Sequence, residues 1–220
     1  IDVHNHGNSG ADFSDGDYDG LKTMAAYLAA GIFAQYKDAY IYVERTLLDG
    51  SVRKGLMGAL DLDQYDYHPQ ANVPVRATEA TVQERIPPRM RVRRGAPLEM
   101  PHVLLLCDDQ KKSIIEPLVA EKENMEKVYD FSLCAGGGNI RGWLLNRELT
   151  GKVNAALAAY EQEKVPLTYA VGDGNHSLAT AKACYEELKK NNPDKDLSNH
   201  PARFALVELE NIHSPAMVFE

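Results

Sequence analysis

The sequence predicts a mixed α and β protein, of the α/β or α+β class, with helices packed on a sheet. Beyond residue 100, short apolar segments typical of strands alternate with longer segments whose apolar residues recur at helical spacing. Before residue 100, a segment rich in Tyr, Ile and Val at 39–46 is followed by Asp49-Gly50 and by a second strand-like segment at 51–60. An Asp-Gly pair between two such segments is typical of a β-hairpin turn.

The first hundred residues contain few other regular elements. Residues 1–3 are apolar and lead into a loop rich in Gly, Asn, Ser and Asp. Residues 21–30 have the pattern of an amphipathic helix that ends at Gly31. Several prolines and a run of arginines between residues 73 and 101 predict a long loop with one short helix.

The remainder of the chain holds most of the expected elements. Strands are expected at 102–107, 128–133, 167–171 and 203–210, and helices at 113–125, 151–163 and 177–190. Glycines at 136–138 predict a turn, and residues 142–146 fit either a strand or a helix.

The composition is that of a globular protein without a membrane span. Of the 220 residues, 44% are hydrophobic and 25% are charged. The longest plainly apolar run, Val103–Cys107, is far shorter than the roughly 20 residues of a membrane helix. Three cysteines without a Cys-x-x-Cys pair predict reduced thiols and a cytoplasmic location. The net charge of −8 disfavours nonspecific binding to nucleic acid.

The chain opens with IDVHNHGNSGADFSDG, which contains the pair His4 and His6. Alternate side chains of a strand point to the same face, where two imidazoles could hold Zn²⁺. The segment resembles the first barrel strand of the amidohydrolases, most closely the N-acetylglucosamine-6-phosphate deacetylase family, in which such a pair binds the catalytic metal. Two ligands fall short of the usual three or four, and nothing after residue 32 continues the pattern. We therefore favour a pair without metal, with Zn²⁺ binding as the alternative.

Four later segments carry a second resemblance: YIYVERTLLDGSVRKGLMGALDL, VRATEATVQERIPPR, PLTYAVGDGNHSLATAKACYEEL and HPARFALVELENIH. They resemble a family of uncharacterised bacterial proteins, domain of unknown function 1015, some of which carry a ParB label. The resemblance implies an α+β fold with a mixed sheet, flanking helices and a C-terminal half like ParB and sulfiredoxin. We expect an amidohydrolase-like fragment at 1–32 and one domain at 36–220, truncated at its carboxyl end because the chain stops within a strand-like run.

The segment Gly172-Asp173-Gly174-Asn175-His176 joins a predicted strand to a predicted helix. The two glycines allow positive φ angles and close approach to the backbone. Free N–H groups at the start of the helix favour an anion such as phosphate. Asp173 has the chemistry to hold Mg²⁺ or accept a proton, and His176 to contact phosphate or shuttle a proton. In the structural alternative, Asp173 or Asn175 only caps the helix.

In the family that the chain resembles, this turn reads DGHHR or a close variant. It is similar to the turn that carries nucleotide phosphate and phosphotransfer chemistry in the free-serine kinases of the ParB and sulfiredoxin superfamily. The resemblance implies catalytic roles for Asp173 and His176 and phosphate contacts at Gly172, Gly174, Asn175 and Ser177. Ser177 replaces an Arg of the relatives, so one positive charge is missing. Asn175 replaces the nucleophilic Cys of sulfiredoxin, which argues against peroxiredoxin repair.

Glu79 lies in a segment, residues 78–81, that aligns with an HEKT-like segment of the family. It is a candidate general base or metal ligand, and the alternative is a solvated carboxylate in the first turn of a helix. Arg76 is a further candidate for phosphate binding. Five arginines between residues 85 and 94 have the charge to neutralise a polyphosphate or an acidic partner, or else form a solvated loop.

From the resemblance, we predict a nucleotide-binding protein that transfers a phosphoryl group to a small molecule, with Mg²⁺ bridging Asp173, Glu79 and the phosphates. One alternative is a noncatalytic nucleotide switch or DNA-partition module of the ParB kind. The acidic charge and the lack of a helix-turn-helix with a basic recognition helix argue against DNA binding. The other alternative is a fragment of a metal-dependent deacetylase.

Overall fold

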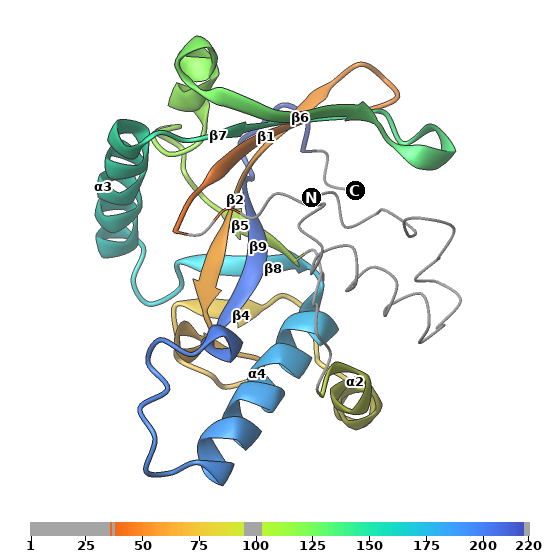
Figure 1. Cartoon of the computed structure of the whole chain (residues 1–220), viewed down its shortest axis with the longest axis vertical. Helices are drawn as coiled ribbons and strands as arrows, with labels where there is room; N and C mark the ends of the chain where they lie inside the picture. Colours follow the sequence, from red (N-terminus) through yellow and green to blue (C-terminus); the bar gives the residue numbers. More distant parts are fainter. Residues whose placement is uncertain (1–35, 37, 95–102, 218–220) are drawn as a thin grey trace.

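The computed structural model describes residues 36, 38–94 and 103–217, which form one nine-stranded sheet with helices around it (Figure 1). The strands follow the order β3-β4-β8-β5-β9-β2-β1-β7-β6. The pairs β3–β4, β4–β8 and β5–β9 are parallel, and the other pairs are antiparallel. This mixed sheet with flanking helices confirms the predicted α+β class.

The bounds of the elements are as follows. The strands are β1 (Ile41–Thr46), β2 (Val52–Asp61), β3 (Tyr65–Asp66), β4 (Val75–Ala77), β5 (Val103–Cys107), β6 (Glu126–Ser132), β7 (Asn139–Leu144), β8 (Tyr169–Asp173) and β9 (Phe204–Asn211). The α-helices in the described part are α2 (Ile86–Arg93), α3 (Arg147–Glu163) and α4 (Asn175–Asn191). The 3₁₀-helices there are η1 (Leu62–Gln64), η2 (Gln83–Arg85), η3 (Glu116–Asn124), η4 (Cys134–Gly136) and η5 (Pro201–Arg203).

Strands β1 and β2 form the hairpin that Asp49-Gly50 predicts. They pair antiparallel over the full length of β1. Gly50 has a φ of +82°, and the Asp49 carboxylate accepts hydrogen bonds from the amide and the hydroxyl of Ser51. The Asp therefore closes the turn through its side chain, and the Gly adopts the backbone angle that other residues avoid.

The elements after residue 100 lie close to their predicted positions, with two differences. The helix predicted at 113–125 is wrong in type, because the structure has the 3₁₀-helix η3 there. Only Leu118 of η3 is buried, so this segment has no continuous apolar face to stabilise an α-helix. Residues 142–146 were compatible with either type, and most of them belong to β7. The helix predicted at 21–30 lies outside the described residues.

Helices α3 and α4 belong to one hydrophobic core with the sheet. Tyr42 of β1 and Leu56 of β2 are in this core, together with Leu149 of α3 and Leu178 of α4. Val43 and Met57, the next residues along the same strands, belong to a second, smaller cluster. Because side chains alternate along a strand, the two clusters lie on opposite faces of the sheet, and α3 and α4 share one face.

The face with the smaller cluster also carries buried charge. Glu208 and Glu210 of β9 are only 2% and 1% exposed. Arg53 Nε of β2 lies 2.7 Å from Glu210 Oε1. Burial, reinforced by the neighbouring Glu208, raises the pKa of Glu210 to about 7. Glu208 packs over Gly55, where the missing side chain leaves room for its carboxylate.

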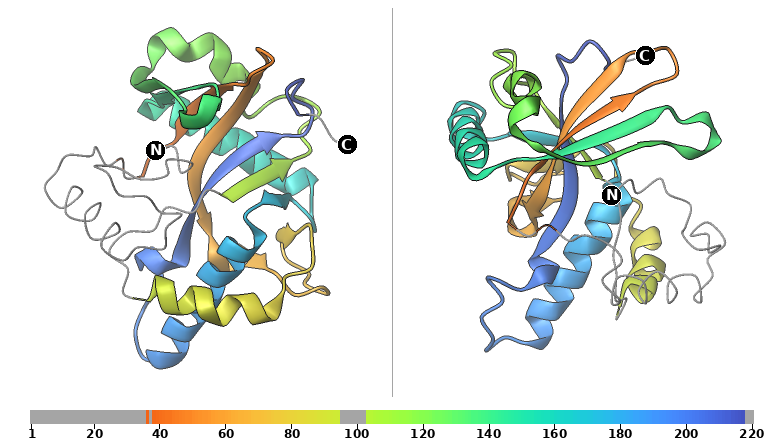
Figure 2. Two further views of the ribbon diagram at one scale, coloured as in Figure 1. Left: turned by 90° about the vertical axis from the view of Figure 1, so that its right-hand side faces the viewer. Right: turned by 45° about the horizontal axis from the view of Figure 1, so that its top comes forward.

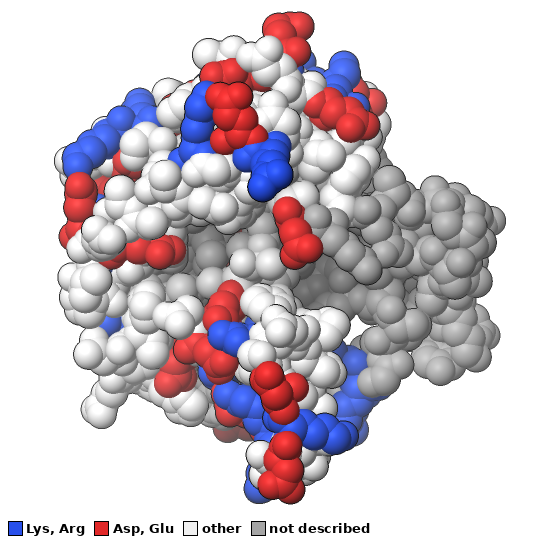
Figure 3. Space-filling view, turned by 60° about the vertical axis from the view of Figure 1, so that its left-hand side comes forward, with Lys and Arg blue, Asp and Glu red and all other residues white. Residues whose placement is uncertain are grey.

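Lysines of α4 connect this helix to η1. Lys189 Nζ lies 3.0 Å from Asp63 Oδ1, and Lys182 Nζ donates to the carbonyl of Leu62 at 2.9 Å. Acidic and basic side chains also lie next to each other on the face shown in Figure 3. None of the described helices is long and apolar enough to cross a membrane.

The substitution Gly55→Ala is expected to lower the free energy of unfolding by about 1–3 kcal/mol, because an added Cβ would overlap the buried Glu208 carboxylate. The matched variant Gly151→Ala, in α3, places its Cβ in open space and is expected to raise this free energy by about 0.5–1 kcal/mol. Urea unfolding measures both effects. Equal effects at the two positions would contradict the packing of Glu208 on Gly55.

The contribution of Glu210 to stability is expected to decrease as the pH rises from about 5 to about 8, by about 1–3 kcal/mol. In this window the folded chain retains a proton on Glu210 that the unfolded chain, with an ordinary glutamate pKa, has released. Glu210→Gln should therefore flatten the pH dependence of the unfolding free energy. The control variant Glu123→Gln, at an exposed position, should leave this pH dependence unchanged. Urea unfolding at several pH values tests this, and an unchanged slope in Glu210→Gln would refute it.

Candidate functional site

A short parallel ladder brings the two predicted site segments together. Strands β4 and β8 pair in parallel over three residues, from Val75↔Tyr169 to Ala77↔Val171 (Figure 1). The carboxyl ends of parallel strands meet at one edge of a sheet, which is a common location of ligand sites in α/β sheets. Here the hydroxyl of Thr78, directly after β4, donates to the carbonyl of Val171 at 2.6 Å. The segment with Glu79 therefore lies beside the glycine turn.

The turn itself is tighter than predicted. Strand β8 extends through Gly172 and Asp173, and α4 begins at Asn175, so Gly174 alone separates them. Gly174 has a φ of +87°, in the region that favours glycine. At Gly172, an added Cβ would come within 2.9 Å of Leu106 on the neighbouring β5. The backbone angle therefore favours glycine at position 174, and the packing of Leu106 favours it at position 172.

The start of α4 has no side-chain cap in the described part of the chain. The Asp173 carboxylate accepts from the amide of Gly174 at 2.8 Å instead of reaching into the first turn. The first backbone hydrogen bond of the helix runs from Leu178 N to Gly174 O. The amides of residues 175–177 precede it and lack intrahelical acceptors. The structure therefore differs from the capping alternative and leaves these amides available to an anion.

Asn175 connects the turn to Glu79. Its Nδ2 lies 3.4 Å from Glu79 Oε1, a long hydrogen bond, and the residue is only 4% exposed. Within the described residues, the buried Oδ1 of Asn175 has no hydrogen-bond partner, and neither has the buried hydroxyl of Thr81. Glu79 itself is exposed and lies in a loop, before η2 and α2, so it is not in the first turn of a helix. This junction therefore offers an exposed carboxylate beside the unpartnered buried oxygen of Asn175.

His176 connects the loop after Glu79 to α4 through a hydrogen bond. Its Nε2 accepts a hydrogen bond from the amide of Val82 at 3.2 Å. Accepting at Nε2 requires a neutral ring with its proton on Nδ1. In this arrangement His176 positions the loop, and only its Nδ1 is available for other contacts.

The structure thus gathers seven of the predicted site residues at one edge of the sheet: Glu79, Gly172, Asp173, Gly174, Asn175, His176 and Ser177. It does not bring Arg76 to them. The Arg76 guanidinium donates to Val73 O and Asn72 Oδ1, in the loop before β4, at 3.0 and 3.1 Å. This is the opposite end of the ladder. His4 and His6 lie outside the described residues.

The residues at the turn fit a metal that arrives with its ligand. Among the described residues, no group of three or more His, Cys, Asp or Glu side chains is arranged to hold a metal. Asp173 and Glu79 nevertheless supply two carboxylates near the uncapped helix. Mg²⁺ commonly uses one or two carboxylates and completes its shell with water and phosphate oxygens. This donor set therefore suits a magnesium–phosphate complex better than a permanent metal centre.

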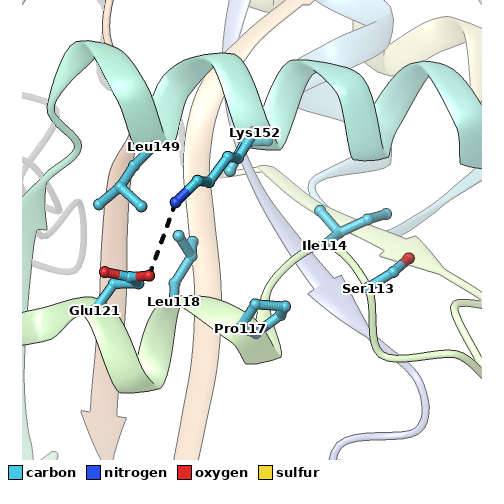
Figure 4. A pocket seen from close by; sticks show the side chains of 8 residues that line it. Ser113, Ile114, Pro117, Leu118, Glu121, Leu149 and Lys152 are labelled. Atoms are coloured by element: carbon cyan, nitrogen blue, oxygen red, sulfur yellow. Dashed lines mark ion pairs between the residues drawn. The ribbon is translucent and has the colours of Figure 1, made fainter.

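A cavity lies on other elements, between η3 and α3 (Figure 4). Its volume is about 60 Å³, and its lining is mainly apolar, with Leu118, Leu149 and Val153. Lys152 and Glu121 form an ion pair at its side, at 4.0 Å. Pockets for small ligands are typically about 300–1,000 Å³, so this cavity is too small for a nucleotide.

The substitution His176→Ala is expected to speed hydrogen exchange of the Val82 amide by about five- to tenfold, because the amide loses its acceptor. His200→Ala is the matched control, since His200 Nδ1 accepts from the amide of Ala202 far along the chain. In this control, the Ala202 amide should exchange faster, and the Val82 amide should exchange as slowly as in the unsubstituted chain. NMR measures the exchange rates of both amides. Unchanged exchange of the Val82 amide in His176→Ala would contradict the hydrogen bond between Val82 and His176.

Comparison with known proteins gives a family match. The family model described as "Protein of unknown function (DUF1015)" matches residues 10–220. The match includes residues 10–32, which were assigned above to an amidohydrolase-like fragment, and the division into two parts remains a prediction. Searches of the curated proteins and of the solved structures gave no match. Because the match covers nearly the whole chain, the protein belongs to this family, as its four sequence segments predict.

Proposed function

We propose that the start of α4 binds the phosphate groups of a nucleotide together with Mg²⁺, and that the chain uses this site to transfer a phosphoryl group to a small molecule. One observation carries the proposal. A helix of 17 residues begins at Asn175 without a side-chain cap, at the edge of the sheet where Asp173 and Glu79 also lie. Amides and a helix dipole that point at one spot favour an anion there.

Electrostatics support a divalent cation in the same site. Asp173 and Glu79 are both exposed carboxylates, and a phosphate bound near them would be repelled. A magnesium ion between carboxylate and phosphate oxygens removes this repulsion and, when bound, neutralises charge that develops on the transferred group. Asp173 is the proposed metal ligand, because its strand ends directly at the helix start.

The other residues have roles that follow from their positions. Gly172 and Gly174 let the ligand approach the backbone, and the amides of Asn175 and Ser177 donate to phosphate. Glu79 accepts a proton from the attacking group, and His176 holds the loop that carries it. Phosphoryl transfer depends mainly on positioning and charge neutralisation, which this set supplies.

Asp173→Asn is expected to weaken binding of a Mg²⁺–nucleotide by about tenfold or more, because one charge that holds the cation is removed. The matched control is Asp194→Asn, an exposed Asp in the loop after α4. Thermal shift and calorimetric titration with ATP, ADP and CTP in Mg²⁺ measure the effect. At 100 times Kd, binding should add about 2.7 kcal/mol to the stability of the unsubstituted chain.

The results of these titrations distinguish a phosphotransferase from a noncatalytic nucleotide switch. Binding with turnover of the γ-phosphate supports phosphotransfer. Binding without turnover for any acceptor tested favours a noncatalytic nucleotide switch at the same site. No shift with any nucleotide, or equal binding by Asp173→Asn and the unsubstituted chain, would overturn the assignment of the turn.

A further inference from the structure

Helix α2 packs against α4 and crosses it obliquely (Figure 2). At one end, the amide of Val82, just before η2, donates to His176 in the first turn of α4. At the other end, Arg94, directly after α2, donates through Nε to Glu187 Oε2 at 2.9 Å. The start of the η2–α2 segment therefore lies at the same end of the helix pair as the glycine turn.

Two arginines at this end have no acidic partner. Arg85 and Arg89 are four residues apart, so they share one side of the helical segment, and both are exposed. Arg89 Nη1 donates to the carbonyl of Arg85 at 3.3 Å, and neither guanidinium forms an ion pair within the described residues. By contrast, Arg94 is neutralised by Glu187. Within the described residues, these two guanidiniums therefore form a positive site that no carboxylate neutralises.

The backbone of α2 offers little to an anion on its own. Pro87 and Pro88, at the start of the helix, have no N–H group. The positive charge at this end therefore comes from side chains. The amide of Arg85 donates to Val82 O at 3.0 Å, so Arg85 follows closely on the residue that His176 binds. Arg89 lies about one turn further, about 6 Å along the helix.

Arg85 thus follows a residue that contacts the first turn of α4, and the Arg89 guanidinium reaches back to the carbonyl of Arg85. We propose that the ligand of the turn carries a chain of two or more phosphates, one at the start of α4 and the next toward Arg85 and Arg89. This inference rests on the proposed function and narrows its ligand. A single phosphate would occupy the amides and leave the arginines unused. Guanidinium groups bind phosphate oxygens in a bidentate manner, which suits a flexible polyphosphate.

The buried amide oxygen of Asn175 is a second indication that the start of α4 receives a ligand. Its Oδ1 is buried without a hydrogen-bond partner in the described part of the chain, and the side chain extends toward Glu79 at the mouth of the turn. Buried polar atoms are rarely left unpaired in a folded protein. A water or hydroxyl group carried in with the Mg²⁺–polyphosphate complex would supply the missing donor.

The test compares ligands with different numbers of phosphates on the full chain. Calorimetric titration in Mg²⁺ uses ATP, AMP and inorganic tripolyphosphate as probes. The variants are Arg85→Gln, Arg89→Gln and the double variant. Arg91→Gln is the control, because Arg91 is exposed on the same helix but points to another side, two residues from Arg89. Circular dichroism confirms that each variant is folded.

We expect ATP to bind at least tenfold more tightly than AMP. The double variant should lose about tenfold or more of its affinity for ATP and change little for AMP, and Arg91→Gln should match the unsubstituted chain. Tripolyphosphate binding with the same dependence on Arg85 and Arg89 would identify the phosphate chain alone as the recognised group. Arginine-dependent binding of ATP without binding of tripolyphosphate would identify a nucleoside polyphosphate.

Equal affinities for ATP and AMP, or an unchanged affinity for ATP in the double variant, would overturn the inference. Either result would leave nucleotide binding at the turn intact, because Asp173→Asn still tests that site separately. Failure of all three probes to bind the unsubstituted chain would overturn the proposed function and the inference together. The two failures are therefore distinguishable.

Discussion

The parallel pairing of β4 with β8 is the constraint on which the candidate site depends. It spans only three residue pairs, yet it places the end of β4 beside the end of β8. The hydrogen bond from Thr78 to Val171 O extends this ladder by one residue, and the bond from Val82 to His176 fixes the loop beyond it. Without the pairing, Glu79 and Asp173 would have no reason to lie at the same edge, and the site would reduce to a helix start with one carboxylate.

Helix α4 is anchored along its length but, in the described structure, has no side-chain cap at its start, and this combination suits a binding site. Buried apolar residues such as Leu178 and Tyr185 hold one side of the helix in the core, and Lys189 pairs with Asp63 near its end. At the start, within the described residues, no side chain caps the helix. The amides are therefore fixed in direction by the rest of the helix while remaining unpaired. Such donors bind an anion without first having to be ordered.

Local sequence signals predicted the local parts of this structure. The Asp-Gly hairpin and helix α4 follow from backbone preferences and apolar spacing within short segments. The family match is likewise carried by local motifs. Strands β3 and β4 are only two and three residues long, and β4 pairs with β8 far along the chain while β3 pairs with β4, so no local pattern identifies them. For the same reason the sequence did not separate Arg76 from the turn: its role depends on which end of a nonlocal ladder its guanidinium reaches.

The positive charge near the glycine turn cannot be judged from the residues of the turn alone, because a segment far along the chain packs against α4. Position 177, in the first turn of α4, is Ser, which brings no positive charge to the start of the helix. Helix α2 packs against α4, and the η2–α2 segment carries Arg85 and Arg89, which have no acidic partner in the described structure. In the proposed complex, these arginines supply from a neighbouring helix the charge that the turn lacks.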